Sequence, residues 1–110
     1  MCCLFSSGVG GTLSDFVRCT VLARSAGYDG VEIMGSEGYL INQFLAGCTN
    51  QRDYKYGGTF NTCMRIATNI VKEMRNAVGK DFILMFRLSM INLIPYGSSW
   101  DEITKLAMAM

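Results

Sequence analysis

Two polar side chains with catalytic potential stand at the ends of apolar runs in this sequence. Tyr39 follows the run Val31–Met34 across a short glycine-flanked turn, and Arg87 lies near the end of the run Phe82–Leu88. A tyrosine phenol can donate a proton to a carbanion that develops on a substrate. A guanidinium that ends an otherwise apolar strand needs an anion as its partner. Proton donation and anion binding are therefore the chemistry that these positions offer.

The same residues also have structural interpretations, and the residue types alone leave both open. Tyr39 can pack its ring against the fold with its hydroxyl at the surface. Arg87 can form an ion pair with Glu32 or Glu37, and Glu37 can be a solvated loop carboxylate. Alternation along a strand places Glu32 on the face turned away from the helices, where a carboxylate should have a partner.

Helices and strands alternate along the chain that positions these residues. In chain order, we expect a helix from Thr12 or Ser14 to about Ala26, a strand at Val31–Met34, a short helix or turn at Tyr39–Leu45, a loop at Cys48–Phe60, a helix at Asn61–Val78, a strand at Phe82–Leu88, a loop at Ser89–Ser99 and a helix from Trp100. This rhythm is typical of an α/β fold with a parallel sheet. The second strand is nearly all apolar, which predicts burial on both faces. Residues 1–11 are rich in serine and glycine and are expected to be disordered.

Glycines and serines predict where the helices end and begin. Gly27 and Gly79 should end the first two long helices, because glycine readily adopts positive φ. Ser98 or Ser99 should cap the last helix, with Glu102 in the capping-box position behind Ser99.

Composition excludes several classes of function. With 110 residues the chain is one domain at most, and its net charge of +1 comes from interspersed acids and bases, which argues against a nucleic-acid surface. No apolar run is long enough to span a bilayer, and no secretion signal is recognisable, so we expect no membrane partner and a cytoplasmic location. Five cysteines, no histidine and no C-x-x-C support neither a disulfide framework nor a metal site.

A series of short motifs resembles one known family. The motifs are Met34–Tyr39, Asn50–Arg52, Tyr56–Gly58, Met64–Arg65, Val78–Ile83 and Arg87–Met90. From Thr12 to Met110 the chain is similar to the old yellow enzyme (NADH:flavin oxidoreductase) family of flavin-dependent (β/α)8 barrels, and its M-G-S-E-G-Y form is similar to the bacterial NADPH 2,4-dienoyl-CoA reductases. Residues 1–11 do not share the resemblance. Because a whole barrel needs about 250 residues, the resemblance implies a partial TIM barrel with about two βα units and a preceding helix.

The resemblance also implies a function and assigns roles to residues. It implies an FMN-dependent oxidoreductase that reduces an activated C=C of an enoyl- or dienoyl-CoA with electrons from NAD(P)H. Tyr39 matches the tyrosine that protonates the substrate carbon opposite the hydride, and Arg87 matches the arginine beside the flavin's pyrimidine edge. Glu37 is expected near the substrate, and Cys48 stands where the reductases have a substrate-contacting arginine. The iron–sulfur cluster and FAD of those reductases would belong to the remainder of the parent enzyme.

Other departures from the family pattern favour a rival interpretation. Tyr54 replaces a loop aspartate, and Thr62 and Cys63 replace an asparagine and an arginine. The rival is an inactive truncated or decayed barrel segment that does not bind flavin and at most self-associates through exposed strand edges. A flavodoxin-like binding domain is a third option, but no phosphate-binding glycine loop follows an early strand.

Overall fold

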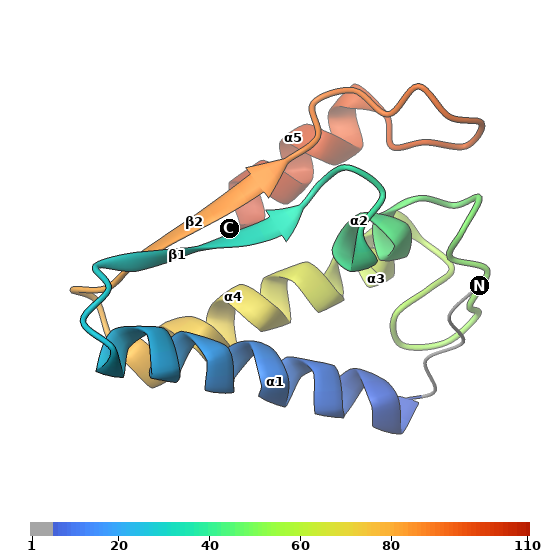
Figure 1. The fold of residues 1–110 in the computed structure, drawn as a ribbon. Coiled ribbons are helices and arrows are strands. Elements are labelled where there is room, and N and C mark those ends of the chain that lie inside the picture. Colours follow the sequence, from blue (N-terminus) through green and yellow to red (C-terminus); the bar gives the residue numbers. More distant parts are fainter. Residues whose placement is uncertain (1–5) are drawn as a thin grey trace.

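The computed structural model describes residues 6–110, which form one small parallel sheet with helices on one side (Figure 1). The elements are, in order, α1 (Ser6–Ser25), β1 (Gly30–Gly35), α2 (Leu40–Leu45), α3 (Phe60–Cys63), α4 (Arg65–Val78), β2 (Ile83–Leu88) and α5 (Trp100–Ala109). Both strands lie within one residue of their expected bounds. The predicted α/β rhythm is therefore confirmed.

The two strands pair in parallel and are joined by a crossover through α4. Gly30 lies opposite Ile83, and Met34 lies opposite Arg87. Parallel pairing brings the carboxyl ends of both strands to the same edge of the sheet. The loops that carry the candidate residues therefore leave the sheet at one end (Figure 1).

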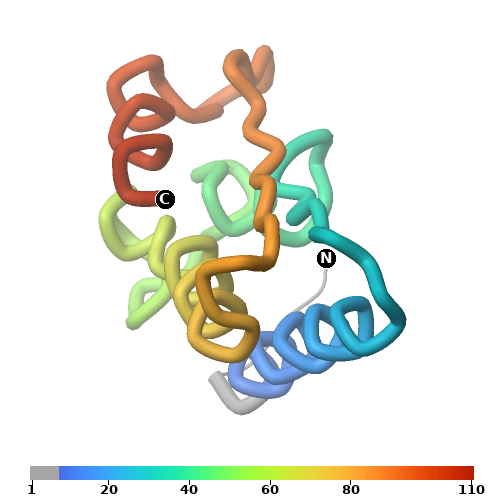
Figure 2. Tube along the Cα trace, turned by 90° about the vertical axis from the view of Figure 1, so that its left-hand side faces the viewer, coloured from blue at the N-terminus to red at the C-terminus, as the bar shows by residue number. Residues whose placement is uncertain are grey.

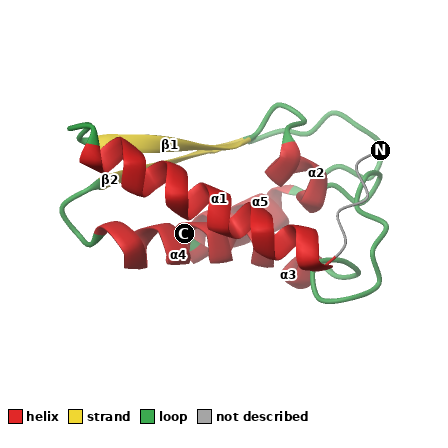
Figure 3. Cartoon of the chain, turned by 60° about the horizontal axis from the view of Figure 1, so that its bottom comes forward, coloured by secondary structure: helices red, strands yellow, loops and turns green. Residues whose placement is uncertain are grey.

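The core lies between the sheet and the helices α1 and α4, which run side by side beneath it (Figures 1 and 3). Ile33 points from β1 into this layer and is 2% exposed, and Ile66 and Ile70 of α4 are fully buried. The buried stripe of α4 repeats at helical spacing and includes Met74 and Val78. Packing of this stripe positions the sheet.

The other face of the sheet is not covered by any described residue, as the view along the strands shows (Figure 2). Ile83 and Met85 are 55% and 57% exposed, whereas Leu84, Phe86 and Leu88 are half-buried toward the helices. The expectation that this strand is buried on both faces is therefore wrong for the described residues. The reason is that the described residues form helices on only one side of the sheet.

Two of the expected helices differ from the prediction. α1 begins at Ser6 and not at Thr12 or Ser14, so residues 6–11 are helical and their expected disorder is wrong; the expectation for residues 1–5 lies outside the described residues. Val9 is fully buried in the core, and the Thr12 hydroxyl donates to the Gly8 carbonyl within the helix, so Thr12 does not cap it. The expected single helix at Asn61–Val78 is divided into α3 and α4 by Met64, whose ψ is −11°.

The predicted helix ends at Gly79 and Ser99 are confirmed. Gly79 has φ 74° and follows the last residue of α4. Arg75 continues this turn, because its Nη1 donates to the carbonyls of Gly79 and Phe82, both at 2.6 Å. Ser99 caps α5 in a reciprocal capping box with Glu102. The turn before β2 and the start of α5 are thus held by local hydrogen bonds.

Candidate active site

An ion pair joins the two strands across the uncovered face of the sheet. Arg87 Nε donates to Glu32 Oε1 at 3.0 Å, and Nη2 donates to Oε2 at 3.2 Å. The Arg87 and Glu32 side chains are 49% and 37% exposed. This two-pronged geometry suits a guanidinium and a carboxylate. Of the two carboxylates that the sequence leaves open as partners, Glu32 forms the hydrogen-bonded pair, and it holds the guanidinium over the sheet.

Glu37 adds a second carboxylate at the same end of the sheet. Its Oε1 lies 4.0 Å from Arg87 Nη1, which is an ion-pair distance but longer than a hydrogen bond. The Glu37 N–H also points at the Ser89 hydroxyl at 3.4 Å, which connects the loop after β1 to the loop after β2. Arg87 therefore lies between two carboxylates, one on the sheet and one on a loop.

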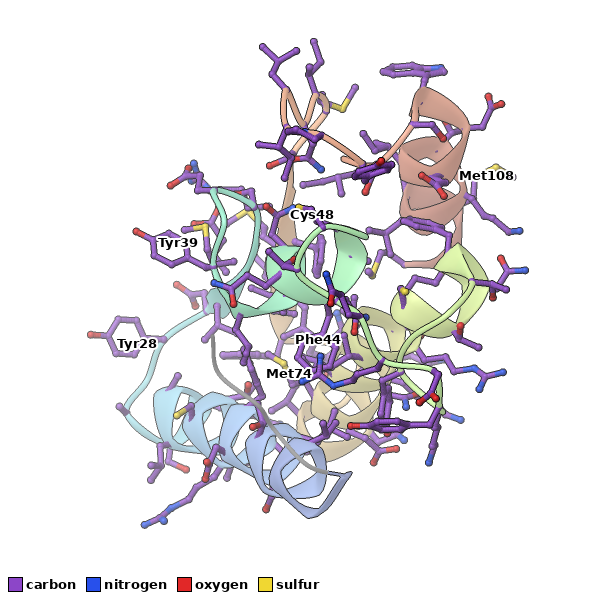
Figure 4. The ribbon with its side chains drawn as sticks, turned by 90° about the vertical axis from the view of Figure 1, so that its right-hand side faces the viewer. Tyr28, Tyr39, Phe44, Cys48, Met74 and Met108 are labelled. Carbon is purple, nitrogen blue, oxygen red and sulfur yellow. The ribbon has the colours of Figure 1, made fainter. Side chains whose placement is uncertain are left out.

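Tyr39 stands at the start of α2, immediately beyond the turn that contains Glu37. It is the N-cap residue of α2, and its side chain has no capping hydrogen bond. The residue is 58% exposed, and its ring extends away from the core, whereas Phe44 points inward (Figure 4). The phenol is therefore accessible to a ligand on the outside of this turn.

The turn before Tyr39 has an unusual backbone. Glu37 has φ 62° and Gly38 has φ 73°, so a non-glycine residue occupies the left-handed region. Asn42 Oδ1 accepts a hydrogen bond from the Gly38 N–H at 2.9 Å, and Gln43 Nε2 donates to the Gly38 carbonyl at 2.7 Å. The sequence interpretation missed both side chains. Both residues lie in the first turn of an expected helix that follows a glycine. That placement is the sequence signal that could have identified them.

Cys48 lies apart in the chain, in the segment that follows α2. It is half-buried and is a free thiol. The neighbouring Gly47 N–H donates to the Tyr96 carbonyl at 3.2 Å, so the loop after β2 contacts this segment. The neighbour of Cys48 in the chain thus contacts the loop after β2, but the Glu32, Glu37 and Arg87 charges are the group that the structure brings together.

A buried asparagine organises the loop beyond Cys48. Asn50 Nδ2 donates to the carbonyls of Phe44 and Tyr56, both at 2.7 Å, and to the sulfur of Cys63 at 3.4 Å. Arg52 stacks on the Phe44 ring at 4.4 Å and donates to Asn50 Oδ1 at 3.0 Å. Asn50 and Arg52 therefore shape this loop.

Cys63 is the most enclosed of the described cysteines. Burial raises the pKa of its thiol above the ordinary value, and the nearby Glu102 charge raises it further, while the Asn50 hydrogen bond opposes the shift. The thiol is therefore kept neutral, in contrast to the arginine that the family resemblance places there. Within residues 6–110, no three potential metal-binding side chains come together.

Arg87 is the cation of this site that could lie beside the flavin that the resemblance implies. Arg87 offers a fixed positive charge on the uncovered face, and Glu32 holds its guanidinium in place. The apolar Met85 lies on the same face and is 57% exposed, which provides a surface for a ring. The residues present therefore fit one edge of such a ligand.

Residues 4–110 match the NADH:flavin oxidoreductase / NADH oxidase family. The matched region begins earlier than Thr12, where the resemblance in the sequence motifs starts. The chain is 38% identical to an NADH oxidase of Thermoanaerobacter brockii over 86% of this chain and 15% of that protein. It is 39% identical to a cinnamate reductase of Clostridium sporogenes over 72% of this chain and 12% of that protein.

A solved structure shares the fold. The structure of a 2-naphthoyl-CoA reductase in complex with 2-naphthoyl-CoA superposes with a TM-score of 0.92 at 30% identity and covers 96% of this chain. This chain covers 16% of that structure. The similar enzymes are TIM barrels, so the two-stranded sheet is part of a (β/α)8 barrel. The chain spans 12% to 16% of the length of these relatives. Among the described helices, none is both long enough and apolar enough to cross a membrane.

Proposed function

Because the chain belongs to the NADH:flavin oxidoreductase / NADH oxidase family, we propose that it contributes to an FMN-dependent reductase of activated C=C bonds that takes electrons from NAD(P)H. The observation that supports this proposal is the position of Arg87. Its guanidinium lies on the uncovered face, at the carboxyl end of β2, next to the loop that carries Glu37 and Tyr39. In α/β barrels the chemistry occurs at this end of the strands.

The proposed substrate class is a conjugated acyl compound, with enoyl- or dienoyl-CoA as the specific candidate. Two similar proteins are named for a conjugated carboxylate and a conjugated thioester, cinnamate and 2-naphthoyl-CoA. In both compounds an unsaturated system is conjugated to a carbonyl, which activates it toward hydride addition. The preference for a dienoyl thioester rests on the M-G-S-E-G-Y motif at Met34–Tyr39.

Each residue of the site has a distinct role in this proposal. FMN, when bound, supplies a hydride, and Arg87 would hold a positive charge beside the edge of the ring that becomes negative. Tyr39 would donate its phenolic proton to the substrate carbon on the face opposite the hydride. Glu37 would lie close to the substrate, and Cys48 would line the substrate path without the charge of an arginine.

A second candidate is an inactive segment that does not bind flavin. The observation that favours it is the uncovered face, where Ile83 and Met85 are more than half exposed. Such a surface is normally covered when a barrel closes. In this alternative the charged residues at the carboxyl end are structural, and the Glu32–Arg87 pair serves only to hold the two strands.

A barrel chimaera distinguishes the two candidates. Residues 4–110 replace the matching segment of the Thermoanaerobacter brockii NADH oxidase, and the purified protein is tested for FMN, for bleaching by NADH and for reoxidation by a 2-enoyl-CoA or 2,4-dienoyl-CoA. The proposal predicts reoxidation that is lost in a matched Tyr39→Phe chimaera. A folded chimaera that contains FMN and is reduced by NADH, but is not reoxidised by either thioester, would contradict the proposal.

A further inference from the structure

The turn that leads into Tyr39 must be held by its surroundings. Two successive residues, Glu37 and Gly38, have positive φ values of 62° and 73°. An L-residue such as glutamate rarely adopts this conformation, and it persists where neighbouring groups determine it. The hydrogen-bond partners of the turn therefore decide its shape.

Those partners come from the first turn of α2. The Gly38 N–H donates to Asn42 Oδ1 at 2.9 Å, and the Gly38 carbonyl accepts from Gln43 Nε2 at 2.7 Å. Both polar backbone groups of Gly38 are therefore bound by side chains. Asn42 is 5% exposed although Gly38 is exposed, so the hydrogen bond is partly shielded from water, and loss of the acceptor leaves the Gly38 N–H without its partner.

The helix that supplies these side chains is itself fixed to the core. Ile41, Phe44 and Leu45 are 1%, 2% and 5% exposed, and all three belong to the core cluster. Phe44 points inward between α2 and the layer of α1 and α4 (Figure 4). The position of Asn42 is thus determined by packing and does not depend on the turn.

Backbone hydrogen bonds of Tyr39 set the direction in which its side chain points. Its N–H donates to the Ser36 carbonyl at 3.2 Å, and its carbonyl accepts from the Gln43 N–H at 2.9 Å. Its ring is 58% exposed, so packing around the ring is too sparse to hold it. The direction in which the phenol leaves the turn is therefore set by the peptides on either side of Gly38.

We propose that Asn42 and Gln43 are positioning residues that fix the Gly38 peptides and thereby set the place of the Tyr39 phenol. Asn42 supplies the acceptor and Gln43 the donor, so the two side chains together oppose rotation of the turn. The catalytic consequence of this clamp rests on the function proposed above for Tyr39. The clamp itself is a property of the chain and can be tested without FMN or substrate.

The first test uses the 110-residue chain with a Met85→Lys substitution, because a charge on the uncovered face opposes self-association. The chain is labelled with ¹⁵N and with ¹³C in its tyrosine rings. Asn42→Leu removes the acceptor at similar size, Asn42→Asp keeps it, and Gln43→Met removes the donor. Asn76→Leu is the matched control, because Asn76 is an exposed asparagine of α4. The measurements are the hydrogen exchange of the Gly38 amide and the ring signals of Tyr39 and Tyr28. Tyr28 is an exposed internal reference, at 68% exposure against 58% for Tyr39.

The clamp predicts a specific pattern of changes. In Asn42→Leu the Gly38 amide should exchange about tenfold faster or more, since a partly shielded hydrogen bond is lost. The Tyr39 ring signals should shift or broaden while those of Tyr28 stay in place, and Asn42→Asp should restore both. Gln43→Met, at an exposed position, should move the Tyr39 signals without unfolding the chain. Unchanged Gly38 exchange in Asn42→Leu, or unchanged Tyr39 signals in both variants, would overturn the proposal.

A second test separates failure of the clamp from failure of the proposed function. In the barrel chimaera, Asn42→Leu should lower kcat for thioester reduction with little change in KM, and should have no further effect in a Tyr39→Phe background. Equal slowing in both backgrounds would show that Asn42 does not act through Tyr39. If Tyr39→Phe is itself neutral, the proposed function is wrong, and the exchange and ring signals still decide whether the clamp exists.

Discussion

Arg87 of β2 binds Glu32 of β1 through two hydrogen bonds of 3.0 and 3.2 Å, and this pair crosses the strands on the uncovered face. The pair links the two βα units at the end of the sheet where the candidate residues lie. It also restrains the guanidinium before any ligand arrives. The same contact therefore has a structural consequence and, in the proposed function, an electrostatic one.

The Glu32–Arg87 pair should contribute little to the stability of the fold. Because the side chains are 49% and 37% exposed, solvent screens the pair, and we expect a coupling energy of less than about 1 kcal/mol between Glu32→Gln and Arg87→Gln. Urea denaturation of the two single variants and the double variant measures this coupling. It should shrink further in 1 M salt. A coupling well above this value that does not respond to salt would show that the pair is the main link between the strands.

The Cys63 thiol should make stability depend on alkaline pH. Its ordinary pKa is 9.0, and burial raises this pKa in the folded chain, so the unfolded thiol ionises first as pH rises. The stabilisation is complete below pH 9.0 and is lost as pH rises from 9.0 through the folded-state pKa. We therefore expect the free energy of unfolding to fall more steeply above pH 9.0 in the wild-type chain than in Cys63→Ala.

The control for this prediction is alkylation by iodoacetamide in the folded chain. Cys19 is exposed and Cys63 is buried, so Cys19 should react first, and Cys63 should react at a rate limited by opening of the fold. Parallel pH profiles for wild type and Cys63→Ala would contradict the assigned pKa shift. Rapid alkylation of Cys63 under native conditions would contradict its burial.

Much of the fold was predictable from local patterns. Val31–Met34 is a short β-branched run between glycines, and α4 has its buried residues at helical spacing, so both elements were predicted to within a few residues. The capping box at Ser99 and Glu102 is a local interaction, and the sequence identifies it directly. The sequence also indicated Glu32 or Glu37 as the partner of Arg87, because a charge in an apolar strand needs one, and the structure shows the hydrogen bonds to Glu32.

The errors came from interactions that a local pattern does not contain. Residues 6–11 hold glycines and serines that disfavour helix, yet Val9 is buried against the core, and tertiary packing outweighs low propensity. Met85 is exposed because no described helix covers its face of the sheet. The apolar composition of β2 does not indicate which faces of the strand are covered. Asn42 was missed because its partner is a backbone N–H of Gly38 whose direction depends on the positive φ of the turn.

Open strand edges should make the isolated chain self-associate. Within residues 6–110 the sheet has only β1 and β2, so each strand has one unpaired edge. An apolar groove of about 330 Å³ lies beside β1 and is lined by Phe16, Val31 and Ile33 among others. Exposed edges of this kind invite pairing with other chains. We expect size-exclusion chromatography with light scattering to show oligomers. We expect the absorbance spectrum of the purified chain to show no tightly bound FMN.

A charge on the uncovered face should reduce this association. Met85→Lys places a cation on the uncovered face, whereas Leu93→Lys is a matched control in the loop after β2, where the side chain is 93% exposed. We expect Met85→Lys to shift the distribution toward monomer and Leu93→Lys to leave it unchanged. A monodisperse yellow monomer in the unmodified chain would contradict the prediction.

Restoring an arginine at position 48 should improve binding of an acyl-CoA in the barrel chimaera. A guanidinium can form charge-assisted hydrogen bonds with phosphate or carbonyl oxygens that the Cys48 thiol cannot form. We therefore expect Cys48→Arg to lower KM for a 2-enoyl-CoA with kcat nearly unchanged. Cys19→Arg, at an exposed position of α1, controls for added positive charge. Equal KM values in the two variants would show that position 48 does not contact the substrate.

Tyr39→Phe keeps the ring but removes the proton that the proposed mechanism requires. In the chimaera, FMN binding and reduction by NADH should be nearly unchanged, because neither involves the phenol. Turnover of the unsaturated thioester should slow by about 10²–10⁴-fold, the usual weight of general acid–base catalysis. The loss should appear in kcat more than in KM, because the proton is transferred in the transition state. Rapid-mixing measurements of the two half-reactions separate these effects, and equal slowing of both, or of neither, would show that Tyr39 is not the proton donor.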